Sequence, residues 1–209
     1  MNERFLLLPE EKRQKIINAG YKVFSENSYK KSPVSEIAAA AGISKSLLFH
    51  YFHNKRDLYI CLFEYAKEIT HKELLNMGVM ESEDFFEFLE KNLRAKCNLT
   101  RRYPYIGAFT LRVFYEQEPE IKNCLRHIFG NLYRDSKKLI QKAMERSDFR
   151  DEIDPELVYN EINWAMYGYM HMVHMSEKVD ANKIESDLLQ MISFWKKIYL
   201  KDEEASHVI

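Results

Sequence analysis

The sequence predicts an all-α protein with a small helical domain at the amino terminus, a larger helical domain after it and about nine helices in total. Three observations lead to this fold class. The 209 residues include only 6 Gly and 5 Pro, a composition typical of long helices with few turns. Apolar residues make up 46% of the chain, enough to bury a sizeable core. Those apolar residues recur at helical spacing along most of the chain.

The stretch from Val34 to Leu58 has the pattern of two short helices, a tight turn between them, and a third helix directly afterwards. Gly42 tolerates the left-handed backbone that ends a helix sharply, and Ser44 can cap the free amides that open the next one. We expect Ile43, Leu48 and Phe52 to face inward. The opposite face is aromatic and mildly basic, which suits the major groove of DNA, and consists of Lys45, Ser46, Leu47, Phe49, His50 and Tyr51.

The segment GISKSLLFHYFHNKRDL resembles the recognition helix and following turn of the TetR/AcrR family of bacterial transcriptional regulators. The residues that fall on the family pattern are Ala41, Gly42, Ile43, Ser44, Leu48, Tyr51, Phe52, Lys55 and Leu58. The resemblance implies a three-helix helix-turn-helix DNA-binding domain over residues 9–69, with the recognition helix at about 44–51. It also implies a helical effector-binding and dimerisation domain over residues 70–203, which resembles the family only in length and helical pattern.

Two positions depart from the family pattern. Phe49 stands where tyrosine is usual, and Leu47 stands where threonine or serine is common, so two hydroxyls that could bond phosphates are absent. We therefore expect DNA contacts to depend more on basic side chains and helix amino termini; Asn54 should cap the helix that begins at Lys55. The candidate DNA-binding residues are Ser32, Ser35, Ser44, Lys45, Ser46, Phe49, His50, Tyr51 and Lys55.

Charge is distributed unevenly along the chain. Residues 1–56 hold ten Lys and Arg against five Asp and Glu, whereas the whole chain has a net charge of -1. A basic region around the helix-turn-helix is what counterion release from DNA requires. The first residues lack the apolar length of a signal peptide, and no stretch approaches the ~20 apolar residues that cross a bilayer. We expect a cytoplasmic protein with reduced thiols at Cys61, Cys97 and Cys124.

Helix boundaries follow from capping signals. The expected first helix starts at Pro9 and ends near Asn27, and Ser32 followed by Pro33 should open the next. A long helix should span residues 55–76, followed by helices at about 85–97, 109–115 and 119–144. Asp154 with Pro155 should begin a helix in which the twelve residues from Trp164 to Met175 carry no formal charge, and Asn182 with Glu185 forms a capping box for the last helix. The acidic run over residues 116–120 reads as a solvated loop and helix start, with Pro119 in the first turn.

The second domain offers candidates for an effector pocket and for a dimer interface. An apolar pocket could have polar groups inside it, with ordinary core packing as the alternative. The pocket candidates are Phe85, Phe88, Cys97, Tyr103, Phe109, Phe129, Tyr133, Asn163, Trp164, Tyr167, His171 and His174. Two apolar helices that pair with their symmetry mates would form a four-helix interface, as in the resembled family. The interface candidates are Gly168, Met172, Leu188, Met191, Ile192 and Trp195.

Catalytic and metal motifs are absent from the sequence pattern. His171 and His174 lie three residues apart, but a third ligand at suitable spacing is missing, so we expect neither a metal nor a cofactor. No nucleophile-base pair or glycine-rich phosphate loop argues for an enzyme. The sequence favours a homodimeric transcriptional regulator, a repressor released from a palindromic operator on double-stranded DNA by a small apolar or amphipathic effector. The alternative is an architectural or protein-partner-controlled regulator of the same fold without an effector.

Overall fold

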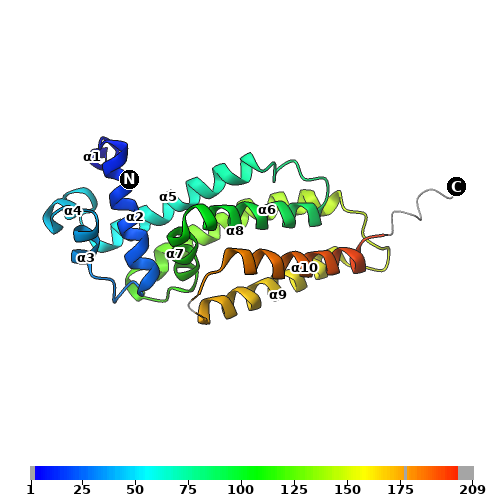
Figure 1. Cartoon of the computed structure of the whole chain (residues 1–209). Coiled ribbons are helices and arrows are strands. Elements are labelled where there is room, and N and C mark those ends of the chain that lie inside the picture. The colour runs from blue at the N-terminus through cyan, green and yellow to red at the C-terminus, as the bar shows by residue number, and fades with distance from the viewer. Residues whose placement is uncertain (1–2, 177, 202–209) are drawn as a thin grey trace. The chain divides into compact units, whose positions relative to one another are not determined.

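The computed structural model describes residues 3–176 and 178–201, and these form ten helices (Figure 1). The first five are α1 (Glu3–Leu6), α2 (Glu10–Glu26), α3 (Val34–Ala40), α4 (Lys45–Phe52) and α5 (Lys55–Asn76). The other five are α6 (Phe85–Arg102), α7 (Pro104–Tyr115), α8 (Pro119–Glu145), α9 (Pro155–Met175) and α10 (Ala181–Tyr199). The predicted all-α fold is confirmed.

The chain packs into two compact units. The first comprises the described residues up to His71 together with Arg102–Gly130; the second comprises Lys72–Arg101 and the described residues from Asn131 onward. The first unit therefore includes α7, which lies beyond the predicted boundary at residue 69, because α7 packs against α2. Helices α5 and α8 each contribute residues to both units. The functional division at residue 69 stays a prediction.

An aromatic cluster forms the core of the first unit. Phe109 of α7 packs against Tyr21 and Phe24 of α2 and against Tyr59 of α5, with ring centroids 5.1 to 6.2 Å apart. The Tyr21 hydroxyl donates to the Leu62 carbonyl at 2.9 Å, so even the polar tip of this buried ring is satisfied. These contacts hold α2, α5 and α7 together behind the helix-turn-helix.

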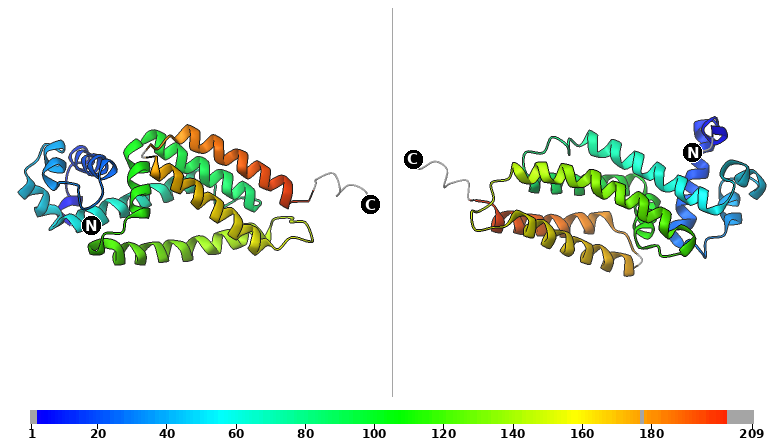
Figure 2. Two further views of the ribbon diagram at one scale, coloured as in Figure 1. Left: turned by 90° about the horizontal axis from the view of Figure 1, so that it is seen from below. Right: turned by 180° about the vertical axis from the view of Figure 1, so that it is seen from behind.

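The second unit has a separate core made by α6, α8, α9 and α10. Its most buried members include Phe86, Ile162, Ile192 and Trp195. Helices α9 and α10 lie side by side in all three views (Figure 2), and the Tyr169 hydroxyl joins them by donating to Asp187 at 2.8 Å.

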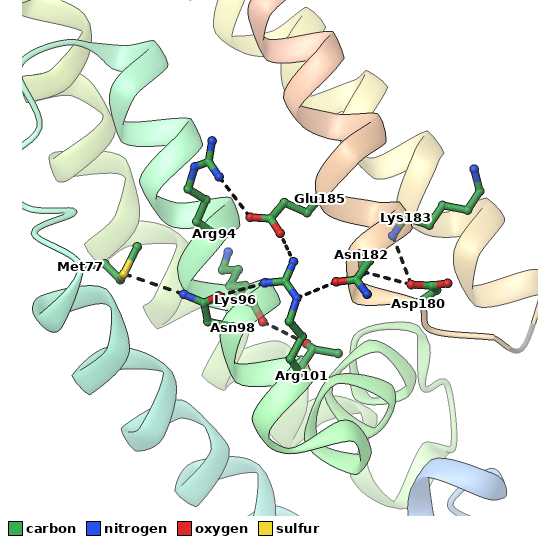
Figure 3. A network of polar contacts seen from close by, with 10 residues as sticks. Met77, Arg94, Lys96, Asn98, Arg101, Asp180, Asn182, Lys183 and Glu185 are labelled. Carbon is green, nitrogen blue, oxygen red and sulfur yellow. Dashed lines mark hydrogen bonds and ion pairs between the residues drawn. The ribbon is translucent and has the colours of Figure 1, made fainter.

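A polar network joins α6 to α10 in the same unit (Figure 3). Arg101 forms an ion pair with Glu185 and donates through Nε to Asn182 Oδ1 at 2.8 Å. Arg94 reaches the other oxygen of Glu185 at 3.4 Å. Glu185 therefore belongs to an interhelical network rather than to the predicted capping box.

Most predicted helix boundaries agree with the structure, and two predicted caps are wrong. Helix α10 is capped by Asp180, whose carboxylate accepts from the amides of Asn182 and Lys183. Helix α3 is preceded by Pro33 without a side-chain cap. The short helix α1 was not expected, because the first start signal in the sequence is Pro9. No helix in the described part of the chain has the length and apolarity needed to cross a membrane.

Candidate nucleic-acid interface

The turn between α3 and α4 is built as the sequence predicts. Gly42 has a φ of 69°, in the left-handed region that glycine adopts without steric cost. The Ile43 amide closes the turn by donating to the Ala38 carbonyl at 3.0 Å. The Ser44 hydroxyl then caps α4 by accepting from the Leu47 amide at 3.1 Å. The turn fixes the direction in which α4 leaves α3.

Helix α4 exposes part of the predicted face. Lys45, Ser46 and His50 are exposed and Phe49 is half-buried. The Lys45 ammonium lies 5.7 Å from the centre of the Phe49 ring, so the two side chains make a cation–π contact along this face. The inward side of the helix carries Leu48, which is fully buried. A short helix with an exposed basic face is suited to the major groove of DNA, whose edges carry guanine and thymine acceptors.

The amino-terminal helix α1 supports α4 from behind. Phe5 is 1% exposed, and its ring centroid lies 4.7 Å from that of Phe52 and 6.2 Å from that of Tyr51. Arg13 of α2 donates to the Leu6 carbonyl at 3.3 Å, which ties α1 to α2. Sequence reasoning missed Phe5. The available signal was the short apolar run at Phe5–Leu8, which precedes the first expected helix.

Lys55 joins α5 to the loop between α2 and α3. Its ammonium donates to the Lys30 carbonyl at 3.2 Å and lies 4.8 Å from the centre of the Tyr29 ring. Burial lowers the pKa of Lys55, and the nearby carboxylates of Glu120, Glu118 and Glu116 act in the opposite direction. The side chain is half-buried, so Lys55 fastens the loop as well as bringing positive charge to this surface.

The same loop is held from its other side by α7 and the acidic run. Glu116 accepts from the Tyr29 amide at 3.0 Å, and Arg112 donates to the Ser25 carbonyl. The prediction that the acidic run is a solvated loop is therefore wrong for Glu116, which is half-buried. Sequence reasoning could not find this contact because it joins residues 87 positions apart.

Two of the nine candidate DNA-binding residues are not on the surface. Ser32 is 1% exposed, and its hydroxyl donates to the Ser28 carbonyl at 2.9 Å. Tyr51 is 7% exposed because its ring packs against Phe5. Both predictions are corrected to structural roles. Ser35 and Ser44 are exposed with Lys45, Ser46 and His50, and Asn54 forms the predicted cap by accepting from the Asp57 amide at 2.8 Å.

An open groove of about 850 Å³ runs beside the carboxyl end of α4, lined among others by Arg56, Ile60, Cys61 and Cys124. Burial raises the pKa of the Cys61 thiol to about 11. A thiol with this pKa stays protonated at neutral pH and is a poor nucleophile. Cys61 therefore fits the packing role expected for it.

The candidate effector residues are divided between core and surface. Phe85, Phe88 and Cys97 are buried in the core of the second unit, and Phe109 is buried in the core of the first. Burial in a core is what the alternative interpretation, ordinary core packing, expects of these four residues. Phe129 packs on Phe63 in the first unit, and Asn163 donates to the Tyr159 carbonyl. Asn163 and His174 are half-buried, whereas the exposed candidates are Tyr103, Tyr133, Trp164, Tyr167 and His171.

The candidate dimer residues are divided in the same way. Leu188, Ile192 and Trp195 are buried within the chain, so they are not available to a partner, and this prediction is corrected. Met172 is 64% exposed, Met191 is half-buried, and Gly168 has no atom within 4 Å of the place where a Cβ would stand. The surface of α9 and α10 exposes other large apolar side chains instead, namely Leu157, Trp164, Met175, Phe194 and Ile198.

The capped turn, the exposed basic face of α4 and the helices packed behind it define a helix-turn-helix protein. Residues 16–61 match the family model of bacterial regulatory proteins of the tetR family. The helix-turn-helix segment is therefore similar to the regulatory proteins of this family.

Individual relatives show a similarity of the same kind. The chain is 43% identical over 53 residues to the fatty acid metabolism regulator protein of Bacillus subtilis, which covers 25% of this chain and 27% of that protein. It is 30% identical over 105 residues to the transcriptional activator FasR of Mycolicibacterium smegmatis, and this alignment covers 43% of this chain and 46% of that protein. The chain thus aligns with less than half the length of either. The structure of the fatty acid degradation regulator FadR from Bacillus halodurans superposes with a TM-score of 0.66 at 23% identity, covering 86% of this chain and 96% of that one.

Proposed function

We propose that this protein is a sequence-specific DNA-binding transcriptional regulator that acts as a homodimeric repressor on a palindromic operator. The observation that carries the proposal is the exposed basic face of α4, held by the Ser44 cap inside a segment that matches the TetR family. Direct base contacts would come from Ser46 and His50, and phosphate contacts from Lys45, Ser35 and the amino terminus of α4.

Dimerisation is supported by an apolar surface on the second unit. Trp164 and Met172 of α9 and Phe194 of α10 are each more than half exposed. Large apolar side chains gathered on neighbouring helices are typical of a protein interface. A two-fold axis through this surface would give two copies of α4, which read half-sites about 34–36 Å apart or multiples of that.

A small apolar or amphipathic effector would release the repressor by binding the DNA-incompetent state more tightly than the DNA-competent state. Helix α5 is suited to transmit such a change, because it begins next to the helix-turn-helix and its last residues belong to the second unit. The similarity to the fatty acid metabolism regulator covers only 53 residues. It therefore supports the DNA-binding role and leaves the effector to be found by screening.

A second candidate function is the same regulator without a small-molecule effector, controlled by a protein partner or acting architecturally. The observation that favours it is a cavity in the second unit that is too small for an effector. This cavity, lined in part by Val79, Phe88 and Leu139, has a volume of about 20 Å³. That is room for about one water molecule, whereas effector pockets occupy roughly 300–1,000 Å³.

The test is selection of bound DNA from a random pool, followed by salt titration on the enriched sequence. A palindrome with a steep negative slope of log affinity against log salt is expected. Lys45→Ala should reduce the salt slope by about 1 without changing the selected sequence. Ser46→Ala should instead change the selected sequence. A selection without enrichment would contradict the regulator proposal. A compound screen on the operator complex then separates the two candidates, because only an effector-controlled repressor is released.

A further inference from the structure

The recognition helix α4 is only eight residues long and depends on its neighbours for its position. An isolated helix of this length is not stable in water, so the packing of its buried face has to hold it. That face consists of Leu48, Tyr51 and Phe52. Tyr51 and Phe52 also line the open groove beside the carboxyl end of α4. Because the groove borders both rings, the contacts that remain to them decide how firmly the last turn of α4 is held.

Phe5 of α1 supplies a contact to both of these rings. Its ring centroid lies 4.7 Å from that of Phe52 and 6.2 Å from that of Tyr51, with interplanar angles of 55° and 58°. Tilted aromatic pairs at such distances are favourable beyond the apolar area that they bury. Two of the three buried side chains of α4 therefore pack on a residue of the amino-terminal segment.

The segment that carries Phe5 buries little else. Over residues 4–10, Phe5 is the one buried side chain, whereas Leu6 is 46% exposed and Leu7 is 83% exposed. The segment is fastened to α2 through its backbone, because Arg13 donates to the Leu6 carbonyl at 3.3 Å. A single buried ring between exposed neighbours indicates that α1 serves to place this ring against α4.

We propose that Phe5 is a positioning residue of the DNA-reading surface, which holds the last turn of α4 so that the exposed face of the helix keeps one orientation toward DNA. The inference rests on the proposed function, because it assumes that this face reads base edges. Hydrogen bonds to base edges carry the sequence information and need an aligned helix, whereas phosphate contacts carry none. Phe5 should therefore contribute to discrimination between sequences more than to affinity for DNA in general. The residue lies before the family match, which begins at residue 16.

The first experiment measures amide hydrogen exchange on the full chain without DNA. Phe5→Ala should raise the exchange rates of the amides of residues 48–53 by about tenfold relative to those of α2, because the last turn of α4 then opens locally. Phe5→Leu keeps most of the apolar volume and should bring these rates back to within about threefold of the wild type. Leu7→Ala removes an exposed leucine from the same segment and should leave them unchanged.

A variant that only destabilises the first unit provides the comparison. Phe109 is buried in the same unit and packs on α2 and α5. Phe109→Leu should therefore raise exchange in α2 at least as much as in α4. If Phe5→Ala also raises both by the same factor, Phe5 contributes only to general stability and the proposal is overturned. Exchange in α4 that stays at the wild-type rate in Phe5→Ala would overturn it as well.

The second experiment compares affinity for the selected operator with affinity for an unrelated duplex. In Phe5→Ala the ratio of the two affinities should fall by about tenfold, while the salt slope on the unrelated duplex stays unchanged. Phe5→Leu should recover most of the ratio, and Leu7→Ala should retain it. An unchanged ratio in Phe5→Ala would overturn the positioning role. If the wild type does not discriminate between duplexes, the proposed function fails together with the base-reading role, whereas the exchange rates alone decide whether Phe5 holds α4.

Discussion

Replacing Glu116 by alanine should destabilise the first unit although the residue lies in an acidic loop. One carboxylate oxygen accepts from the Tyr29 amide at 3.0 Å, and the other accepts from the amides of Gln117 and Glu118 at 2.9 Å each. The alanine variant leaves three backbone donors without this partner. Water can reach the amide of exposed Gln117, so the loss of the hydrogen bond to this amide should cost little free energy.

The magnitude follows from the bond that is hardest to replace. A hydrogen bond between a charged group and a buried partner contributes roughly 1.5–3 kcal/mol, and loss of a turn or cap contact adds about 0.5–1 kcal/mol. The free energy of unfolding should therefore fall by about 2–4 kcal/mol in Glu116→Ala. Glu116→Gln keeps one oxygen acceptor of the same size and should lose about 1 kcal/mol.

Urea denaturation of both variants beside Glu36→Ala provides the measurement. Glu36 is exposed in the first turn of α3, so its removal matches the change in charge and should cost about 0.5 kcal/mol through the amino terminus of α3. Equal losses for Glu116→Ala and Glu36→Ala would refute the reasoning, because the effect would then come from charge rather than from the contact with the Tyr29 amide.

The remaining predictions concern the dimer, the amino terminus and pH. If a partner helix packs against Gly168, Gly168→Ala should raise the dissociation constant of the homodimer by about tenfold to a hundredfold, measured by analytical ultracentrifugation. Gly130→Ala is the control, because a Cβ at Gly130 likewise has no atom within 4 Å, and it should leave the dissociation constant unchanged. Phe5→Ala should lower the free energy of unfolding by about 3 kcal/mol through loss of a buried ring; Leu7→Ala, at 83% exposed, should change it by less than about 0.5 kcal/mol, and similar urea midpoints would contradict the docking of α1. A lysine and a tyrosine that donate to Asp187 lower the pKa of this carboxyl. A carboxyl whose pKa is lower in the folded state than in the unfolded state stabilises the fold at pH values above its unfolded pKa. That stabilisation is lost as the pH falls through the folded pKa. The difference in free energy of unfolding between wild type and Asp187→Asn should therefore close below about pH 4. A gap that is constant with pH would exclude this linkage.

Helix positions were predictable where a single capping residue dominates. Asn54 fixes the start of α5, and Asp154 with Pro155 fixes the start of α9, and both form as expected. Prediction failed where two capping residues lie close together. Asp180 and Asn182 are both good amino-terminal caps, and the choice between them depends on Glu185, which is engaged by arginines of another helix.

The inward face of the last helix was not predictable from periodicity. Helix α10 has apolar residues on more than one side, and the sequence-based prediction named Trp195 rather than Phe194 as an interface residue. The packing of α6 and α9 decides between them, since it buries Trp195 and leaves Phe194 61% exposed. The same limit applies to the aromatic pocket candidates, because a buried phenylalanine has the same spacing whether it faces a cavity or another ring.

The loop before the helix-turn-helix is held through its backbone, and this has a consequence for which substitutions matter. Glu116 accepts from the amide of residue 29, Arg112 donates to the carbonyl of residue 25, and Lys55 donates to the carbonyl of residue 30. Backbone groups are present whatever the side chain, so exchanges at exposed loop positions such as Lys30 preserve these three bonds. The residues that supply the side chains lie in α5, in α7 and directly after α7. Changes that alter the placement of α3 should therefore arise at those distant positions more readily than in the loop itself.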